Sequence, residues 1–285
     1  MIESELLNRI QKYARKWSVG VGDTFETKSS VITFGTHDHQ PVVLKVIKRP
    51  GDEWHSGEIL AAFDGNGVAR VYNWAPGAVL MERLTPGNSL VSMVENGGDE
   101  EATDVLAGVI RQMSGRESAR PPLKLPKSCM TVQDWAQGFE RYIATGDDQI
   151  PLDLVEAAHR VYSGLCATQR QPTLLHGDLQ HYNVLFDSSR GWLAIDPKGV
   201  IGELEFEIGP VLRNPIERPE LFLSRSTIER RLKQFTSRLH LDYERALAWG
   251  FAQAVLSGIW DIEDGFVVDA TNPSLRLAET IRPKT

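Results

Sequence analysis

The sequence has 285 residues, of which 41% are hydrophobic and 24% are charged. This composition excludes a disordered or fibrous chain, and the length suffices for one large domain or two lobes with a buried core. The formal net charge of −7 argues against a general nucleic-acid binder, which would usually show a basic surface. The same charge would suit a cationic small molecule, although an ordinary solvated surface explains it as well.

No hydrophobic run reaches the length of a membrane span, and the N-terminus lacks the apolar stretch and cleavage site of a secretory signal. The two cysteines, Cys129 and Cys166, are too few and too far apart for a disulfide framework or a cysteine metal site. We expect a cytoplasmic protein with no membrane or nucleic-acid partner, present as a monomer or a weak homodimer.

The first part of the chain predicts one helix followed by a small, mostly β region. Apolar residues recur at helical spacing near the N-terminus, and short β-rich runs separated by turn-forming residues follow. The expected order is a helix over 4–17, strands over 31–34 and 42–47, a helix over 52–63, and strands over 68–74 and 78–82.

Turn residues at 85–88 separate this region from a remainder in which helical periodicity dominates. We therefore predict an α+β chain of two lobes, with a small β-rich lobe over 1–84, a hinge at about 82–88, and a larger helical lobe over 85–285. Helices are expected over 89–95, 100–113, 131–144, 153–169, 226–240 and 242–260, with a loop over 120–126.

Polar residues in the middle of the chain carry the chemistry. Asp178 ends the triplet 176–178, Asn183 leads into an apolar run, and a turn and a second apolar run end on Asp196. An antiparallel hairpin returns to where it began, so it would bring Asn183 and Asp196 together. Asp178 suits the orientation of an attacking hydroxyl, while Asn183 and Asp196 offer the oxygen ligands that Mg²⁺ prefers. The pattern predicts a phosphotransferase site, although a coincidental polar loop is the alternative.

These motifs resemble the aminoglycoside phosphotransferase superfamily, and most closely its streptomycin 6-phosphotransferase and hydroxyurea kinase group. The likeness runs from about residue 17 to about 265 and is carried by 175–185, 194–199, 212–215 and 251–260. It implies a bilobal protein-kinase-like fold that uses ATP, or another nucleoside triphosphate, with Mg²⁺. The γ-phosphate would pass to a hydroxyl of a small molecule, with streptomycin as the leading acceptor and antibiotic resistance as the role.

Lys45 is the predicted contact of the nucleotide phosphates. It lies within the run 42–47, where strand alternation sends its ammonium toward a ligand and its neighbours toward the core. We predict that Glu58 on the following helix holds this ammonium, as in protein kinases, and Glu53 is the competitor. A lysine that blunts an exposed strand edge is the alternative to a functional Lys45.

No glycine-rich phosphate loop precedes Lys45. The resemblance implies a shorter serine-bearing turn, and the segment 27–30 stands at the appropriate place between two strands. Backbone amides there, with the hydroxyls of Ser29 and Ser30, would cradle phosphate, although a solvated hairpin turn explains these residues nearly as well. For adenine, the resemblance implies backbone hydrogen bonds from Glu82 and Leu84.

Recognition of the acceptor is expected in the large lobe. Carboxylates there would suit the guanidinium or amine groups of an aminoglycoside, and an aromatic face would add an apolar or cation-π contact. Lys198 either meets a phosphate oxygen or pairs with Glu203, and both remain open. The predicted acceptor residues are Glu205, Trp260, Glu263 and Asp264.

Two other functions stay open. The chain is alternatively a metabolic kinase of a sugar or amino sugar, or a kinase-like nucleotide sensor without turnover. The joint presence of Lys45, Asp178, Asn183 and Asp196 argues against the sensor. The absence of an Ala-Pro-Glu activation segment after Asp196 argues against a protein kinase.

Overall fold

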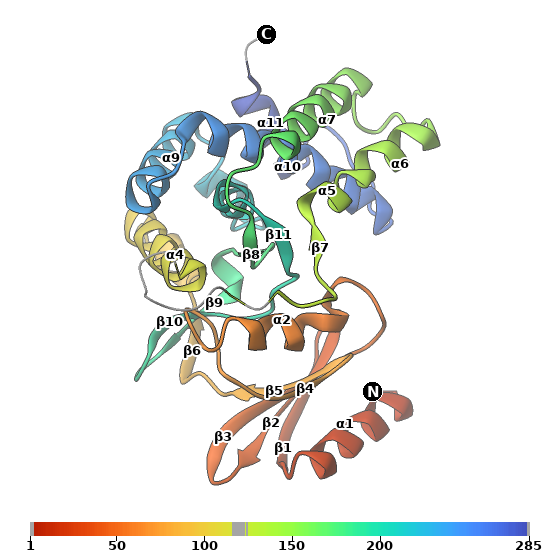
Figure 1. Cartoon of the computed structure of the whole chain (residues 1–285), viewed down its shortest axis with the longest axis vertical. Coiled ribbons are helices and arrows are strands. Elements are labelled where there is room, and N and C mark those ends of the chain that lie inside the picture. The colour runs from red at the N-terminus through yellow and green to blue at the C-terminus, as the bar shows by residue number, and fades with distance from the viewer. Residues whose placement is uncertain (1–2, 116–122, 124, 284–285) are drawn as a thin grey trace.

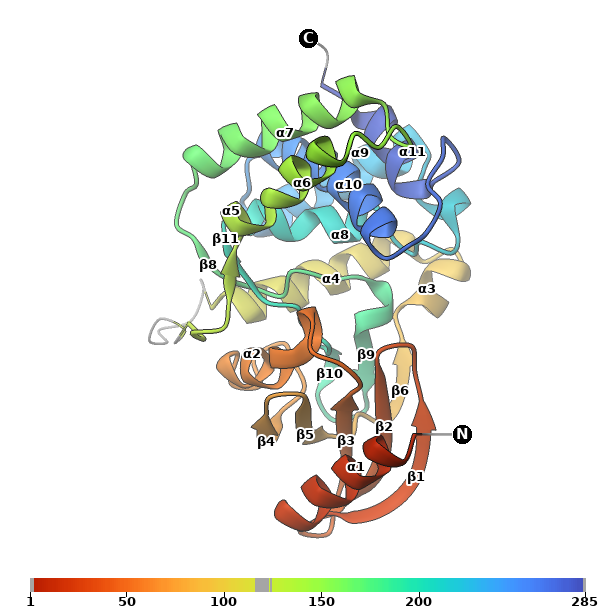
Figure 2. The same ribbon diagram turned by 90° about the vertical axis from the view of Figure 1, so that its right-hand side faces the viewer.

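The computed structural model describes residues 3–115, 123 and 125–283. It has two lobes, with a β-sheet at one end and a mostly helical body at the other (Figures 1 and 2). Of the predicted loop over 120–126, residues 120–122 and 124 lie outside the described residues. No helix in the described ranges is both long and apolar enough to cross a membrane.

The small lobe is built on an antiparallel five-stranded sheet in the order β1-β2-β3-β5-β4. Its strands are β1 (Gly20–Glu26), β2 (Ser30–His37), β3 (Gln40–Ile47), β4 (Val71–Ala75) and β5 (Ala78–Glu82). In β3, Val42, Leu44 and Val46 pack in the core formed with α1 (Ser4–Lys16), whereas Val43 belongs to the core on the opposite side. Strand alternation therefore turns Lys45 away from α1, as the sequence predicts.

The other face of the sheet is covered by α2 (Ser56–Ala62), which follows the 3₁₀ turn η1 (Asp52–His55). Figures 1 and 2 show α2 between the sheet and the large lobe. Ile59 and Leu60 of α2 belong to the same continuous core as the buried residues of the large lobe. One core thus spans both lobes and fixes the walls of the cleft between them.

Helices make up most of the large lobe, and α10 (Tyr243–Glu263) is buried along most of its length. The single helix predicted over 131–144 is two helices separated at Ala136. The C-terminal helix is not among the predicted ones, although Asn272 and Pro273 are ordinary helix-start signals. The helices are α3 (Val91–Glu95), α4 (Asp99–Ser114), α5 (Val132–Trp135), α6 (Gln137–Thr145), α7 (Leu152–Ala167), α8 (Ile208–Leu212), α9 (Arg225–Leu239), α10 (Tyr243–Glu263) and α11 (Pro273–Ile281).

Two small sheets bring Asp178, Asn183 and Asp196 to the cleft. The predicted hairpin is confirmed, since β9 (Val184–Asp187) and β10 (Gly191–Ala194) are antiparallel, and β6 (Pro86–Ser89) pairs with β9 on its other side. In the second sheet, β11 (Val200–Gly202) lies between β8 (Thr173–Leu175) and β7 (Met130–Thr131). The pairing of β11 with β8 places the segment after Asp196 beside the segment before Asp178.

Candidate active site

The Lys45 ammonium is the point at which the two lobes meet. Its Nζ lies 2.8 Å from Glu53 Oε2 and 2.8 Å from Asp196 Oδ1, and the side chain is only 3% exposed. Burial acts to lower the pKa of Lys45, but the carboxylates of Asp196 and Glu53 outweigh it and the pKa is raised. Burial likewise acts to raise the pKa of Glu53, and Lys45, with help from Ser29, lowers it. Lys45 and Glu53 are therefore held ionised in the cleft, and Asp196 pairs with the same ammonium.

The prediction that Glu58 holds Lys45 is wrong. Glu58 Oε2 instead accepts a hydrogen bond from Ser128 Oγ at 2.7 Å. The reason is local geometry, because residues 52–55 form a 3₁₀ turn and not the first turn of one continuous α-helix. The tighter turn changes which side chains share a face, and it presents Glu53 to β3 while α2 directs Glu58 toward the large lobe.

Asn183 and Asp196 lie at the open end of the hairpin, as predicted from the return of an antiparallel pair. Ile195 N donates to Asn183 O at 2.9 Å, and Asn183 Nδ2 donates to Asp178 O at 2.9 Å. Asp196 has φ 57°, in the left-handed region that aspartate tolerates better than most residues. The chain leaves the hairpin at Asp196, and in this conformation the Asp196 carboxylate contacts Lys45.

The side chains of Asn183 and Asp196 fit a magnesium ion that arrives with a nucleotide. The Asn183 amide oxygen makes no hydrogen bond to any described residue, and Asp196 uses Oδ1 for Lys45. Mg²⁺ typically takes one or two protein oxygens and completes its shell with phosphates and water. The described ranges contain no group of three or more His, Cys, Asp or Glu side chains that could enclose a metal without such a partner.

Glu207 braces the backbone of the turn that carries Asp178. Its Oε2 accepts from His176 N at 2.6 Å and its Oε1 accepts from Gly177 N at 3.0 Å. Burial raises the pKa of Glu207 to about 7, although these amide hydrogen bonds act to lower it. The sequence offers no local signal for this role, because Glu207 lies 31 residues from His176 and meets it only in the fold.

His176 is a neutral second brace. Asp178 N donates to His176 Nδ1 at 3.3 Å, so the ring proton lies on Nε2, which is 2.8 Å from Ile195 O. Burial lowers the pKa of His176 and keeps it uncharged. Gly177 has φ 78°, and a Cβ there would lie 3.0 Å from the Trp135 ring, so the turn requires glycine.

A cavity of about 440 Å³ lies between the sheet and the hairpin. Apolar side chains form much of its wall, and Lys45 and Asp196 stand at its charged end. An apolar slot that ends in charge suits a flat base with a phosphate tail. It is also lined by the predicted nucleotide residues Ser29, Ser30, Glu82 and Leu84.

The two predicted hinge positions, Glu82 and Leu84, differ in which groups are available to a ligand. Glu82 uses its side chain elsewhere, since its Oε1 accepts from Arg70 N at 2.7 Å and pairs with Arg190. Leu84 N–H makes no hydrogen bond within the described ranges. Leu84 N–H is therefore available to a ligand in the slot, whereas Glu82 N already donates to Arg70 O at 2.9 Å.

The serine-bearing turn is closed largely by its own hydrogen bonds. Thr27 Oγ1 lies 2.8 Å from Ser30 Oγ and accepts from Ser30 N at 3.0 Å. The buried Ser30 hydroxyl is thus used within the turn, while the Ser29 side chain contributes to the lowered pKa of Glu53. Ser29 is the better placed of the two for a phosphate.

The predicted acceptor residues do not form one cluster. Glu205 is buried and accepts from Asp242 N at 3.5 Å, at the start of α10. Trp260, Glu263 and Asp264 lie at the other end of this 21-residue helix, about 30 Å away at 1.5 Å per residue. The prediction is therefore wrong for Glu205 as a member of a shared site.

The remaining acceptor candidates differ in their contacts. Glu263 is used in an ion pair with Arg141 Nη2 at 2.8 Å. Trp260 packs edge-to-face on Trp135 with ring centroids 5.4 Å apart. Asp264 is exposed and lines a cavity of about 750 Å³ beside the phosphate end of the cleft. Trp260 and Asp264 thus stay near the chemistry, and Glu263 mainly ties α10 to α6.

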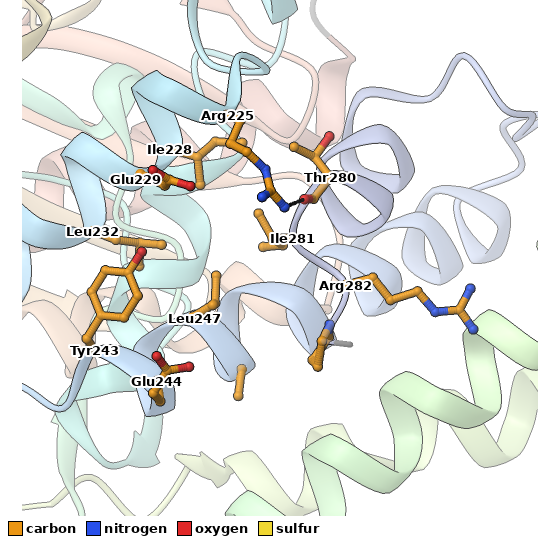
Figure 3. Close-up of a pocket in the computed structure, with 12 residues that line it drawn as sticks. Arg225, Ile228, Glu229, Leu232, Tyr243, Glu244, Leu247, Thr280, Ile281 and Arg282 are labelled. Carbon is orange, nitrogen blue, oxygen red and sulfur yellow. Dashed lines mark hydrogen bonds between the residues drawn. The ribbon is translucent and has the colours of Figure 1, made fainter. Parts of the chain in front are cut away.

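A further cavity of about 390 Å³ lies between α9, α10 and α11. Figure 3 shows Arg225 of α9 reaching Thr280 of α11, and its Nη2 donates to Thr280 O at 3.1 Å. Figures 1 and 2 place α11 at the end of the molecule opposite the five-stranded sheet. None of the predicted site residues lines this cavity, so it is separate from the cleft.

A family model described as aminoglycoside/hydroxyurea antibiotic resistance kinase matches residues 16–265. The chain belongs to this family. This protein is therefore a phosphotransferase that acts on a hydroxyl group. The superfamily predicted from the sequence is confirmed.

Two named relatives match most of the length of this chain. It is 35% identical to a streptomycin 3''-kinase from Klebsiella pneumoniae over 247 residues, which is 86% of this chain and 88% of the relative. It is 28% identical to a hydroxyurea phosphotransferase from Kitasatospora aureofaciens over 284 residues, covering 92% of this chain and 75% of the relative.

Solved structures with low sequence identity share the fold. Aminoglycoside phosphotransferase APH(4)-Ia, in a ternary complex with AMP-PNP and hygromycin B, matches with a TM-score of 0.66 and 15% identity over 95% of this chain and 97% of that one. Choline kinase LicA from Streptococcus pneumoniae matches with a TM-score of 0.63 and 13% identity over 98% and 99% of the two chains. The predicted bilobal protein-kinase-like fold is confirmed.

Proposed function

We propose that this kinase transfers the γ-phosphoryl group of ATP, in the presence of Mg²⁺, to a hydroxyl of a streptomycin-like aminoglycoside. The observation that carries the proposal is the Lys45 ammonium fixed between Glu53 and Asp196 at the charged end of an apolar slot. A buried cation held in this way offers a preorganised contact for phosphate oxygens. In this proposal residues 1–84 bind the nucleotide, and residues 85–285 supply catalysis and the acceptor site.

Asp178 acts on the acceptor. It orients the acceptor hydroxyl and takes up its proton as the new oxygen–phosphorus bond forms. The bond between the γ-phosphorus and the bridging oxygen breaks in the same step, and ADP leaves. Transfer of this kind passes through a loose transition state, so the main tasks of the protein are alignment and charge. The bracing of the turn by Glu207 and His176 supports that alignment.

Asn183 and Asp196 would hold Mg²⁺, which when bound neutralises charge on the phosphate oxygens. Lys45 would contact the α and β phosphates. The adenine base would lie in the apolar slot and hydrogen-bond to the backbone of Glu82 and Leu84. These assignments agree with a slot whose apolar wall and charged end lie in the order of a base and its phosphates.

The acceptor is proposed from two sources. The 35% identical relative bears the name streptomycin 3''-kinase, and the exposed Asp264 beside the phosphate end of the cleft suits a cationic molecule. Hydroxyurea is the second candidate, because the family description and a 28% identical relative both name it. The position of the phosphate on the product identifies which hydroxyl of the aminoglycoside is attacked.

The test is an ADP-release assay with purified protein, ATP and Mg²⁺, run with streptomycin, hydroxyurea, glucosamine and choline as separate acceptors. We expect streptomycin-dependent ADP release and a phosphorylated product whose modified hydroxyl is located by NMR. Release with glucosamine alone would favour the metabolic kinase. Nucleotide binding without ADP release for any acceptor would favour the sensor and remove the proposed activity.

A further inference from the structure

We propose that Lys198 is a further catalytic residue, which contacts the γ-phosphoryl group while it moves from the nucleotide to the acceptor. This proposal rests on the proposed phosphotransferase function and adds a group that bridges its donor and acceptor sides. It follows from the partners of Lys198, from the way its backbone is fixed, and from what its ammonium faces.

The alternative partner of Lys198 is already occupied. Glu203 is fully buried, and its Oε1 accepts from Arg245 Nε and from Trp249 Nε1, each at 2.5 Å. Its Oε2 accepts from Arg170 N at 2.9 Å. These contacts satisfy the carboxylate of Glu203, so it is not the partner of Lys198.

Lys198 has only one weak ionic contact. Within the described ranges, Asp52 Oδ2 is the carboxylate oxygen that comes within 4.0 Å of its ammonium, and the Asp52 side chain is 80% exposed. An ion pair this open to water contributes little to stability. The charge of Lys198 is therefore available for a ligand.

The backbone of Lys198 is held firmly next to the catalytic turn. Gly199 N donates to His176 O at 2.9 Å, which ties the segment after Asp196 to the segment before Asp178. Gly199 has φ 78°, and a Cβ at this position would lie 2.4 Å from Ile59 Cδ1. The chain passes so close to α2 that only glycine fits at position 199. Lys198, the preceding residue, is therefore presented at a fixed point of the cleft.

The side chain of Lys198 lies between the two sides of the site. Its Nζ is 5.5 Å from the ring centroid of Trp260, within the range of a cation-π contact. It lines the cavity of about 750 Å³ together with Ser29 and Glu53 of the small lobe and Asp264 of the large lobe. Glu53 is also the partner of Lys45, so Lys198 faces the phosphate end of the slot from the acceptor side.

This position matches the place where charge moves during the reaction. In a loose transition state, negative charge is spread over the oxygens of the transferred phosphoryl group. An ammonium aimed at those oxygens stabilises the transition state more than either bound ground state. Trp260 then acts through Lys198 as a positioning residue. The ring face that a cationic acceptor could have used is in contact with the Lys198 ammonium.

The test compares Lys198→Met with a matched control, Lys12→Met. Lys12 Nζ also lies over an aromatic ring, 5.6 Å from the centroid of Tyr13, but on α1 on the far side of the sheet. We expect Lys198→Met to lower kcat for transfer by about 10²- to 10³-fold, with nucleotide affinity changed only a few-fold. Slow ATP hydrolysis without acceptor should fall by a similar factor, because water attacks the same phosphoryl group. Lys12→Met should leave both rates unchanged.

Two further variants make the result decisive. Lys198→Arg should retain part of the activity, and Trp260→Leu should lower kcat less than Lys198→Met does. If Lys198→Met does not fold in a thermal melt, Lys198→Gln, which keeps a polar side chain without the charge, takes its place with the same expected loss.

Each contrary outcome has a distinct meaning. Unchanged kcat in the charge-free variant would overturn the role of Lys198. Lost transfer with unchanged ATP hydrolysis would also overturn it, because Lys198 would then bind the acceptor and not the phosphoryl group. A wild-type chain that neither transfers phosphate nor hydrolyses ATP would remove the proposed function itself, whatever the variants do.

Discussion

The proposed donor side and the proposed acceptor side of the cleft are built in different ways. On the donor side, Lys45 is 3% exposed and pairs with two carboxylates. The catalytic turn that carries Asp178 is similarly fixed, since its backbone rests on the buried Glu207. On the acceptor side, Asp264 is exposed, and Lys198 has one weak ionic contact among the described residues. The charges are thus fixed on the donor side and lightly held on the acceptor side.

This difference has a physical reason. A buried charge is tolerated only when it is paired, so every charged group of the donor side depends on its partners. An exposed wall carries no such constraint, because water solvates each side chain separately. The donor side is therefore suited to one ligand chemistry, whereas the acceptor wall can change its residues at little cost to folding. Substitutions on the two sides should accordingly differ in size.

The largest effect is expected at Asp178. Asp178→Asn should fold and bind nucleotide normally, because the carboxylate makes no hydrogen bond within the described ranges that folding would lose. It should lower kcat for transfer by about 10²- to 10⁴-fold, the usual contribution of a positioned base. Single-turnover transfer and nucleotide titration measure the two quantities. Equal turnover in the variant would remove Asp178 from the chemistry.

The next effect is a pH dependence of stability that originates in Glu207. Its folded-state pKa of about 7 lies above the ordinary value of 4.5, so folding favours the protonated carboxyl. The contribution of this group to the free energy of unfolding is complete below pH 4.5 and is lost as the pH rises through about 7, by on the order of 3 kcal/mol. Denaturant titrations of wild type and Glu207→Gln from pH 5 to 8 should show a difference that declines with pH. Parallel curves would contradict the raised pKa.

Glu53 and Glu58 provide a matched pair on the donor side. Glu53→Gln should lower kcat/KM for ATP by about 10- to 100-fold, since a hydrogen bond to a charged group contributes roughly 1.5–3 kcal/mol. Glu58→Gln should change it less than about threefold, because Glu58 bonds Ser128 and not Lys45. Steady-state kinetics on both variants decide the assignment. A larger loss in Glu58→Gln would restore the partner predicted from the sequence.

The smallest effect is expected on the acceptor side at Glu263. Its ion pair with Arg141 is largely exposed, with side chains 38% and 57% accessible, so it contributes less than about 1 kcal/mol. Glu263→Gln should therefore change the free energy of unfolding slightly and the KM for streptomycin by less than about twofold. A large rise in that KM, with stability unchanged, would return Glu263 to the acceptor site.

Much of the fold follows from local patterns in the sequence. The alternation around Lys45, the hairpin that joins Asn183 to Asp196 and most of the long helices are read from spacing alone, and the structure confirms them. These features depend on residues a few positions apart, so a short window of sequence contains the interactions that produce them. The main departures are the 3₁₀ turn over 52–55, the split at residue 136, and strand β1 and helices α8 and α11, for which no range is predicted.

The sequence by itself predicted which side chains carry the chemistry, because a base, an amide and a carboxylate at this spacing have few other uses. Only the tertiary structure decided their partners. The choice of Glu53 over Glu58, the bracing of the turn by Glu207 and the separation of Glu205 from Trp260 all join residues from different elements. Such contacts depend on how the elements pack, and a pattern within one element does not specify the distance to another.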